Sequence, residues 1–144
     1  MIELAASAAV MISCLGGTFQ FGYTFYVYNQ LVTAVGNGAR YAAQRTYRAA
    51  TPADIEKGNA AIRNMVVFGD AQPAADAAPV VKGLTTEQVD VKWGPEESGA
   101  PSTVTVGIKS YTVDAVFKSF TFAGRPSVEF PHVGRFAPEP EARQ

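Results

Sequence analysis

The strongest constraint in this 144-residue sequence is a run without any charged side chain, from Leu4 to Ala39. Glu3 is the only charge before that run ends, although the whole chain holds 12 basic and 13 acidic residues. As a helix, the stretch from Leu4 to Phe25 would be about 33 Å long, close to the ~30 Å hydrocarbon layer of a bilayer. The sequence therefore predicts a long apolar helix followed by one domain of about 100 residues.

Composition and charge argue against several classes of function. An apolar content of 47% is too high for a disordered chain, and a pI near 5.8 with scattered Lys and Arg argues against a nucleic-acid partner. Cys14 is the only cysteine and is expected to pack rather than react, and His132, the only histidine, is expected to be a surface or packing residue. Because no nucleophile has an evident base and no phosphate-binding glycine loop occurs, we expect no catalytic residue, no metal and no cofactor. An enzyme is not expected.

Small residues recur at every fourth position of the apolar run. On a helix this spacing forms one ridge of little bulk, along which a second helix backbone can approach closely. The alternative is a membrane anchor that is simply rich in alanine. The ridge consists of Ala5, Ala9, Ser13 and Gly17.

Aromatic residues crowd together after the ridge. Such side chains favour the boundary between membrane and water, and they also contribute large buried areas to interfaces between subunits. Both interpretations stay open. The cluster consists of Phe19, Phe21, Tyr23, Phe25, Tyr26 and Tyr28.

The apolar pattern continues past the length of a membrane span and becomes amphipathic. An i, i+3, i+4, i+7 spacing predicts that one face is buried against the head while the opposite face is polar. A break or an extended stretch is expected at Gly16 and Gly17, where two glycines weaken the helix. The buried face would hold Tyr28, Leu31, Val32, Val35, Ala39 and Ala42, and the polar face Asn29, Gln30, Thr33, Asn37, Arg40 and Gln44. We assign residues 1–50 to this helix.

Processing and orientation allow several interpretations. A cleaved secretory signal would need early basic residues, which are missing, and Met11 to Cys14 only faintly resembles a lipoprotein cleavage site. Arg40, Arg45 and Arg48 follow the span with no basic residue before it, so the positive-inside rule would place the head in the cytoplasm. A basic leader that has been removed would reverse this orientation.

The head, residues 51–144, is expected to begin with a helix. Thr51 is a suitable N-cap, Pro52 suits the first helical position, and Gly69 suits the C-terminal end. The segment 70–79, rich in Ala, Asp and Pro, is expected to be a loop. The buried stripe of the helix would be Ile55, Ile62, Met65 and Val66.

Alternating residues then predict strands. The segments 89–93 and 104–108 should form a hairpin around the turn-rich segment 94–101, and 128–130 a last strand. The segment 113–122 fits a short helix covering the sheet, although its end could also be extended. The tail 138–144 should be loose. The fold class is therefore α+β, with the C-terminal half of a long apolar helix packed on a small antiparallel sheet of about three strands.

Three features in order give the N-terminal region a family resemblance. They are an acidic residue at the start in Met1–Leu4, an aromatic Phe-Gly segment in 21–29, and Gly38-Ala39-Arg40-Tyr41-Ala42. Over residues 1–48 the chain resembles TadE-like proteins, which are pilin-like proteins of tight-adherence type IV pilus systems. Over 84–136 the resemblance extends only to the architecture.

The resemblance implies a pilin-like fold and a precursor that a prepilin peptidase cleaves in the inner membrane. It also implies assembly by pilus machinery into a helical filament of identical copies at the bacterial surface. Glu3 matches the pilin-type glutamate near the mature N-terminus, where it would set register by pairing with the free amine of a neighbouring subunit, the group that Met1 would carry. Pilins commonly place this acid fifth, so either the spacing is unusual or residues precede Met1.

The residues and the resemblance leave three alternative functions. The chain is a structural filament subunit, an inner-membrane minor pilin or assembly factor of a tight-adherence system, or a single-pass anchored binding module. The first is the function that we expect.

Overall fold

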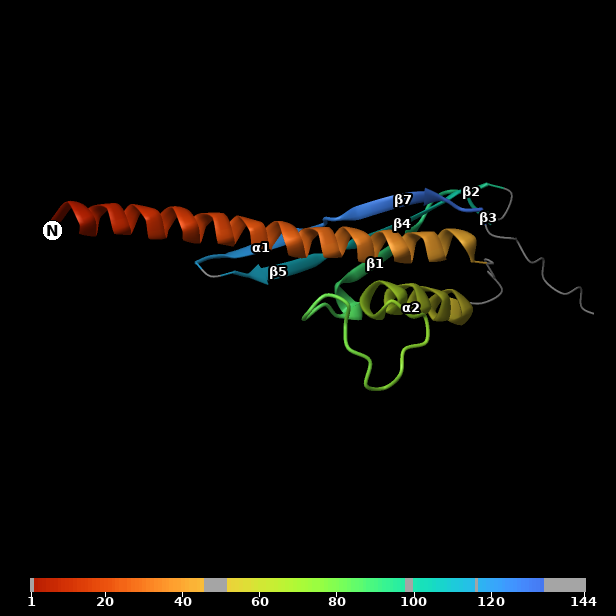
Figure 1. Cartoon of the computed structure of the whole chain (residues 1–144). Helices are drawn as coiled ribbons and strands as arrows, with labels where there is room; N and C mark the ends of the chain where they lie inside the picture. The colour runs from red at the N-terminus through yellow and green to blue at the C-terminus, as the bar shows by residue number, and fades with distance from the viewer. Residues whose placement is uncertain (1, 46–51, 98–99, 116, 134–144) are drawn as a thin grey trace, which may run out of the picture.

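The computed structural model describes residues 2–45, 52–97, 100–115 and 117–133, and it combines one long helix with a smaller α/β head (Figure 1). Helix α1 (Ile2–Gln44) runs the full length of the molecule, and the head gathers around its C-terminal half. The order along the chain is α1, α2, a 3₁₀ turn η1, and strands β1 to β7. The predicted α+β class, with a long apolar helix on a small antiparallel sheet, is confirmed.

Helix α1 is continuous, so the break expected at Gly16 and Gly17 is absent from this structure. Two glycines cost about 1 kcal/mol each relative to alanine, a loss that a helix of 43 residues tolerates. From Val27 onward, the helix buries an apolar face as its periodicity predicts. Val32 is an exception, because its side chain is 37% exposed. The buried apolar residues of this half are Val27, Leu31, Ala34, Val35, Ala39, Ala42 and Ala43.

The central sheet has three antiparallel strands in the order β1-β4-β7. β1 (Val89–Trp93) pairs with β4 (Thr103–Ile108) as the predicted hairpin, and the connecting segment adds two short paired strands, β2 (Glu96–Glu97) and β3 (Ala100–Pro101). β7 (Ser127–Pro131) pairs with the other edge of β4. Their inward side chains meet in register, with Val106 opposite both Val91 and Val128.

Of the two predictions for 113–122, the short helix is wrong, and the extended end, over 119–122, is confirmed. This region forms a second hairpin of β5 (Ser110–Asp114) and β6 (Ser119–Ala123), in which Val113 pairs with Phe120. β5 continues the direction of β4, and β6 leads into β7 through Gly124, whose φ of 69° suits glycine. The hairpin lies along α1 and reaches toward its N-terminus (Figure 1). Packing of Phe122 on Tyr28 of this helix outweighs the helical spacing of the apolar residues.

Helix α2 (Pro52–Phe68) packs beside α1 and covers β1. Ile62 and Val66 are buried as predicted, Val67 joins them, and Ile55 and Met65 are only half-buried. Gly69 ends the helix with a φ of 73°, and an irregular loop follows over 70–79 as expected. The 3₁₀ turn η1 (Thr86–Gln88) then leads into β1. Thr51 and the tail 138–144 lie outside the described residues.

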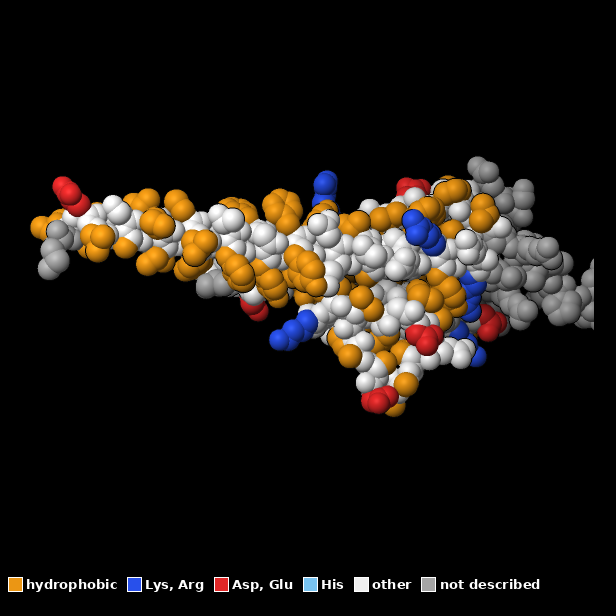
Figure 2. All heavy atoms as spheres, in the orientation of Figure 1, with side chains coloured by type: hydrophobic (Ala, Val, Ile, Leu, Met, Phe, Trp, Pro, Cys, Tyr) orange, Lys and Arg blue, Asp and Glu red, His pale blue; other side chains and the backbone are white. Residues whose placement is uncertain are grey.

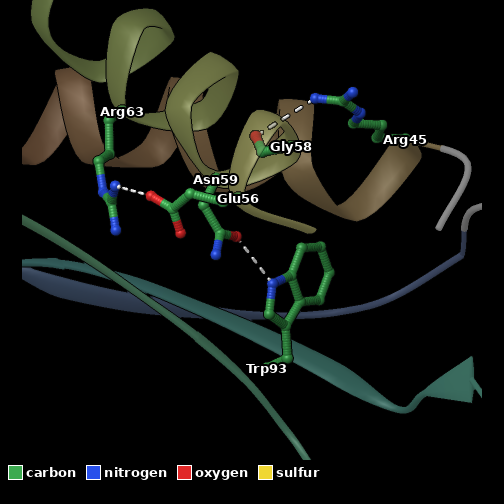
Figure 3. A network of polar contacts seen from close by, with 6 residues as sticks. All are labelled: Arg45, Glu56, Gly58, Asn59, Arg63 and Trp93. Atoms are coloured by element: carbon green, nitrogen blue, oxygen red, sulfur yellow. Dashed lines mark hydrogen bonds and ion pairs between the residues drawn. The ribbon is translucent and has the colours of Figure 1, made fainter. Parts of the chain in front are cut away.

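Polar contacts fix α2 between α1 and the sheet (Figure 3). Nη1 of Arg45 donates to the carbonyl oxygen of Gly58 at 3.2 Å, and Nε1 of Trp93 donates to Oδ1 of Asn59 at 3.0 Å. On the solvent side, Arg63 donates to the carboxylate of Glu56 at 2.7 Å, and this hydrogen bond lowers the pKa of Glu56 from its ordinary value.

The end of α1 is held by the segment after β7. The backbone N–H of Val133 donates to the carbonyl oxygen of Ala43 at 3.0 Å, and Nε2 of His132 lies 3.0 Å from the carbonyl oxygen of Arg45. His132 also meets the ring of Trp93 edge-on, with centroids 5.6 Å apart. These contacts satisfy carbonyl groups that a helix end leaves without partners. His132 therefore has the packing role that the sequence predicted.

Candidate assembly and membrane-contact surface

The N-terminal half of α1 extends beyond the head with its apolar side chains exposed (Figure 2). By length and composition α1 is the one helix, among the described residues, that could cross a membrane. Exposed apolar surface on this scale marks a contact with another protein or with lipid. The large exposed side chains of this half are Ile2, Leu4, Val10, Met11, Ile12, Leu15, Phe19, Phe21, Tyr23, Phe25 and Tyr26.

Glu3 lies in the first turn of α1 and is exposed at the end farthest from the head. A carboxylate there interacts favourably with the helix dipole. Met1, the proposed partner position, lies outside the described residues. The role of both residues in filament register stays a prediction.

The small-residue ridge lies on the part of α1 that the head does not cover. Ala5, Ala9 and Ser13 are exposed, and Oγ of Ser13 donates to the carbonyl oxygen of Ala9 at 2.8 Å, so the hydroxyl is satisfied within the helix. A Cβ placed on Gly17 would meet nothing within 4 Å. The ridge is thus open to a neighbouring backbone, although close helix packing there is still a prediction.

The aromatic cluster divides into two groups. Tyr28 is half-buried and packs on Phe122 of β6 with ring centroids 5.1 Å apart, so it belongs to the head. Phe21 is mostly exposed and only approaches Phe120, with centroids 6.4 Å apart. The other exposed members are Phe19, Tyr23, Phe25 and Tyr26. This exposed group surrounds the point where α1 leaves the head.

Sequence reasoning missed a contact at that point. Gln20 is only 5% exposed, and its amide holds the turn between β5 and β6. Its Nε2 donates to the carbonyl oxygen of Lys118 at 2.6 Å, and its Oε1 accepts from the backbone N–H of Phe117 at 2.9 Å. The ring of Phe117 lies over Gly16, where a Cβ would collide with it. The signal in the sequence was Gln20 itself, the one amide side chain between Leu4 and Phe25.

A groove of about 440 Å³ separates β5 from α1 and from the loop before η1. Tyr23 and Val27 line it on the helix side, and Tyr111 lines it on the strand side. The hydroxyl of Tyr111 donates to the carbonyl oxygen of Lys82 at 2.6 Å, and burial raises the pKa of this phenol. Among the described residues, no group of three or more His, Cys, Asp or Glu side chains could hold a metal ion.

Comparison with known proteins bears on the helix alone. The family of TadE-like proteins matches residues 1–40. No curated protein and no solved structure matches the chain. The matched segment contains Glu3, the small-residue ridge, the aromatic cluster and Gln20. Over residues 1–40, the chain is therefore similar to TadE-like proteins, as its residues indicated.

Proposed function

We propose that this protein is a structural subunit of a tight-adherence pilus-like filament, which polymerises through the exposed half of α1. The TadE-like match supports an association with such pili. The observation that carries the proposal is the division of α1, whose C-terminal half is buried in the head while its N-terminal half exposes apolar side chains.

The exposed half of α1 needs a hydrophobic environment outside the chain. Side chains such as Leu4 and Leu15 are 78% and 74% exposed, and burial of one such side chain contributes about 1.5–3 kcal/mol. A bilayer supplies this environment to a single subunit, and a bundle of helices supplies it to a filament. A subunit that is first held in the inner membrane and then moves into a surface filament keeps its helix covered in both states.

In this proposal Glu3 distinguishes a filament subunit from a simple anchor. A carboxylate in an apolar bundle is costly unless it is paired, and the free amine of an adjacent subunit is a suitable partner after prepilin-type cleavage. The head would stay on the outside of the bundle, because α2 and the sheet are attached only to the C-terminal half of α1.

A second candidate function is that of a minor pilin or assembly factor resident in the inner membrane. The observation that favours it is the match to the TadE-like family, which covers the exposed half of α1. Such a subunit would be present in few copies and would use the same helix to prime a filament of another pilin.

Shearing of surface fibres, followed by electron microscopy and mass spectrometry of their subunits, tests the proposal. We expect this chain to be a main component of the fibres. Its recovery only from inner-membrane fractions would refute the filament role and favour the second candidate.

The variant Glu3→Gln tests the pairing. It should reduce incorporation into fibres, whereas Glu87→Gln, an exposed position in η1, should leave incorporation unchanged. Equal fibre yields from both variants would remove the proposed role of Glu3. Sequencing the N-terminus of the isolated protein shows whether Met1 carries the amine.

A further inference from the structure

We propose that the turn between β5 and β6 rests on the surface of the phospholipid bilayer and fixes how deeply α1 is inserted. Phe117 would lie at the edge of the hydrocarbon layer and Lys118 at the headgroups. This inference requires a membrane-resident chain and does not depend on whether the chain polymerises.

The argument begins with the length of α1 that the head leaves uncovered. Backbone groups of the turn contact α1 at Gln20, and the ring of Phe117 reaches one turn further, to Gly16. Past the backbone contacts at Gln20, the remaining part of α1 is Ile2–Phe19. These 18 residues measure about 27 Å as a helix, close to the ~30 Å of a hydrocarbon layer. The uncharged run continues to Ala39, but past Phe19 it lies beside the head, as where Phe21 approaches Phe120 of β6.

A two-stranded hairpin cannot enter the hydrocarbon layer at low cost. β5 and β6 pair with each other, and each unsatisfied backbone group at an open strand edge costs several kcal/mol in lipid. If the whole stretch from Leu4 to Phe25 were in the bilayer, this hairpin would have to enter it or detach from α1. If the hydrocarbon layer ends at Gln20, the hairpin neither enters the layer nor detaches from α1.

The tip of the hairpin has the chemistry of a membrane boundary. The side chain of Phe117 is 67% exposed, and the adjacent Lys118 is also exposed. Aromatic rings favour the interface, and a lysine can place its ammonium among headgroups while its stem stays in an apolar layer. The acidic group at this end, Asp114, accepts a hydrogen bond from Ser119 at 2.8 Å.

Two backbone groups of the turn are satisfied where water would be scarce. Gln20 supplies the acceptor for the N–H of Phe117 and the donor for the carbonyl of Lys118. An amide side chain that pairs two backbone groups at the edge of a bilayer removes the penalty for burying them. This explains why a polar residue occupies a buried position in an otherwise apolar stretch.

A shallow apolar hollow next to the tip completes the surface. It has a volume of about 250 Å³ and is lined by Ile12, Leu15, Gly16, Phe19 and Phe117. Its lining extends from Phe117 of the turn to Ile12, within Ile2–Phe19. Acyl chains that surround Ile2–Phe19 would fill it, which makes the lipid surface a continuation of the apolar surface of the helix.

Depth-dependent quenching of tryptophan fluorescence tests the proposal on the full chain. The chain is reconstituted into vesicles of phosphatidylcholine and phosphatidylglycerol that carry a nitroxide either on the headgroup or at the middle of an acyl chain. Phe117→Trp introduces the probe, and the wild-type signal of Trp93 in the head gives the background. Val80→Trp reports an exposed head position, and Ile12→Trp reports a position inside the span.

We expect quenching of Trp at position 117 mainly by the headgroup label, quenching at position 12 mainly by the acyl label, and no added quenching at position 80. Lys118→Glu, combined with the probe at 117, should lose most of the headgroup quenching. Lys109→Glu, at the junction of β4 and β5, serves as the matched control and should retain it.

Three results would overturn the proposal. If Trp at position 117 is quenched no more than the wild-type background, the turn lies in water. If the acyl label quenches this Trp more strongly than the headgroup label does, the turn lies inside the bilayer. A blue-shifted probe that no lipid label quenches would show that a neighbouring protein, and not lipid, covers the turn.

Discussion

Gly38 of α1 lies directly against Val66 of α2, and a Cβ on Gly38 would overlap with the Cγ2 atom of Val66. The missing side chain lets the two helices approach closely where both are buried. Gly36, one half-turn away, faces open space instead, because a Cβ there would meet nothing within 4 Å. Two glycines in one helix thus have different roles.

Gly38→Ala should destabilise the head by about 1–3 kcal/mol, because the added methyl overpacks the contact between α1 and α2. Gly36→Ala is the matched control and should stabilise the chain by about 0.5–1 kcal/mol through helix propensity. Denaturant unfolding in detergent measures both free energies. Equal effects of the two substitutions would show that the contact at Val66 does not constrain Gly38.

Gln20→Leu should release the turn between β5 and β6. The variant leaves the N–H of Phe117 and the carbonyl of Lys118 without their partner, at a cost of about 1–3 kcal/mol for local opening. Hydrogen exchange at the Phe117 amide should therefore become faster. Gln30→Leu removes an amide that donates to the hydroxyl of Tyr26 on the same helix and should leave this exchange unchanged. Unchanged exchange in Gln20→Leu would contradict the contact.

Tyr111 should make the head less stable at high pH. Burial raises the pKa of this phenol above its ordinary value near 10, so the folded state favours the neutral form. Its stabilising contribution is complete below the unfolded-state pKa and is lost as the pH rises through the folded-state pKa. Tyr111→Phe should cost about 1 kcal/mol at neutral pH through loss of the hydrogen bond to Lys82, and should weaken the alkaline decline.

The control for this prediction is Tyr26→Phe, at an exposed position on α1. It should keep the full alkaline decline of the wild type. Unfolding free energies measured at neutral pH and near pH 11 give the comparison. An identical pH dependence of wild type and Tyr111→Phe would be inconsistent with a role for the buried phenol.

Ala9→Leu should hinder assembly without affecting the fold. Ala9 is exposed at the centre of the small-residue ridge, so a larger side chain would keep a neighbouring helix backbone at a distance. Val10→Leu, at the adjacent exposed position, is already bulky and should assemble normally. The yield of sheared fibres measures the effect, with circular dichroism as a check on folding. Normal yield from Ala9→Leu would mean that the ridge is only part of an anchor.

Local patterns in the sequence predicted most of the head. The alternation at Val89, Val91 and Trp93 predicted β1, and Gly69 marked the end of α2, because these signals act over a few residues. The segment around Val113 and Phe120 was misassigned for the same reason. Its spacing fits a helix, but the rings of Phe120 and Phe122 meet Phe21 and Tyr28 of α1, about 100 residues earlier in the chain and outside any local window.

The pairs Gly16–Gly17 and Gly36–Gly38 show the same limit of local sequence patterns, which do not report contacts with distant residues. Gly16 and Gly17 suggested a break, because glycine weakens an isolated helix, yet α1 continues through them. The need for glycine at position 16 comes from the ring of Phe117, about 100 residues further along the chain, and the need at position 38 comes from Val66. Neither contact could be inferred from the composition of α1.

The amino-acid sequence was enough to predict a long helix over the uncharged residues 4–39, because a run without charges has few stable environments. It also determined that an amphipathic continuation joins this helix to a small α/β head. Only the tertiary structure decided where the head stops along α1, since that limit depends on the Gln20 amide meeting two backbone groups of a distant turn. The part of α1 left for a membrane or for other subunits therefore follows from long-range contacts, and not from hydropathy alone.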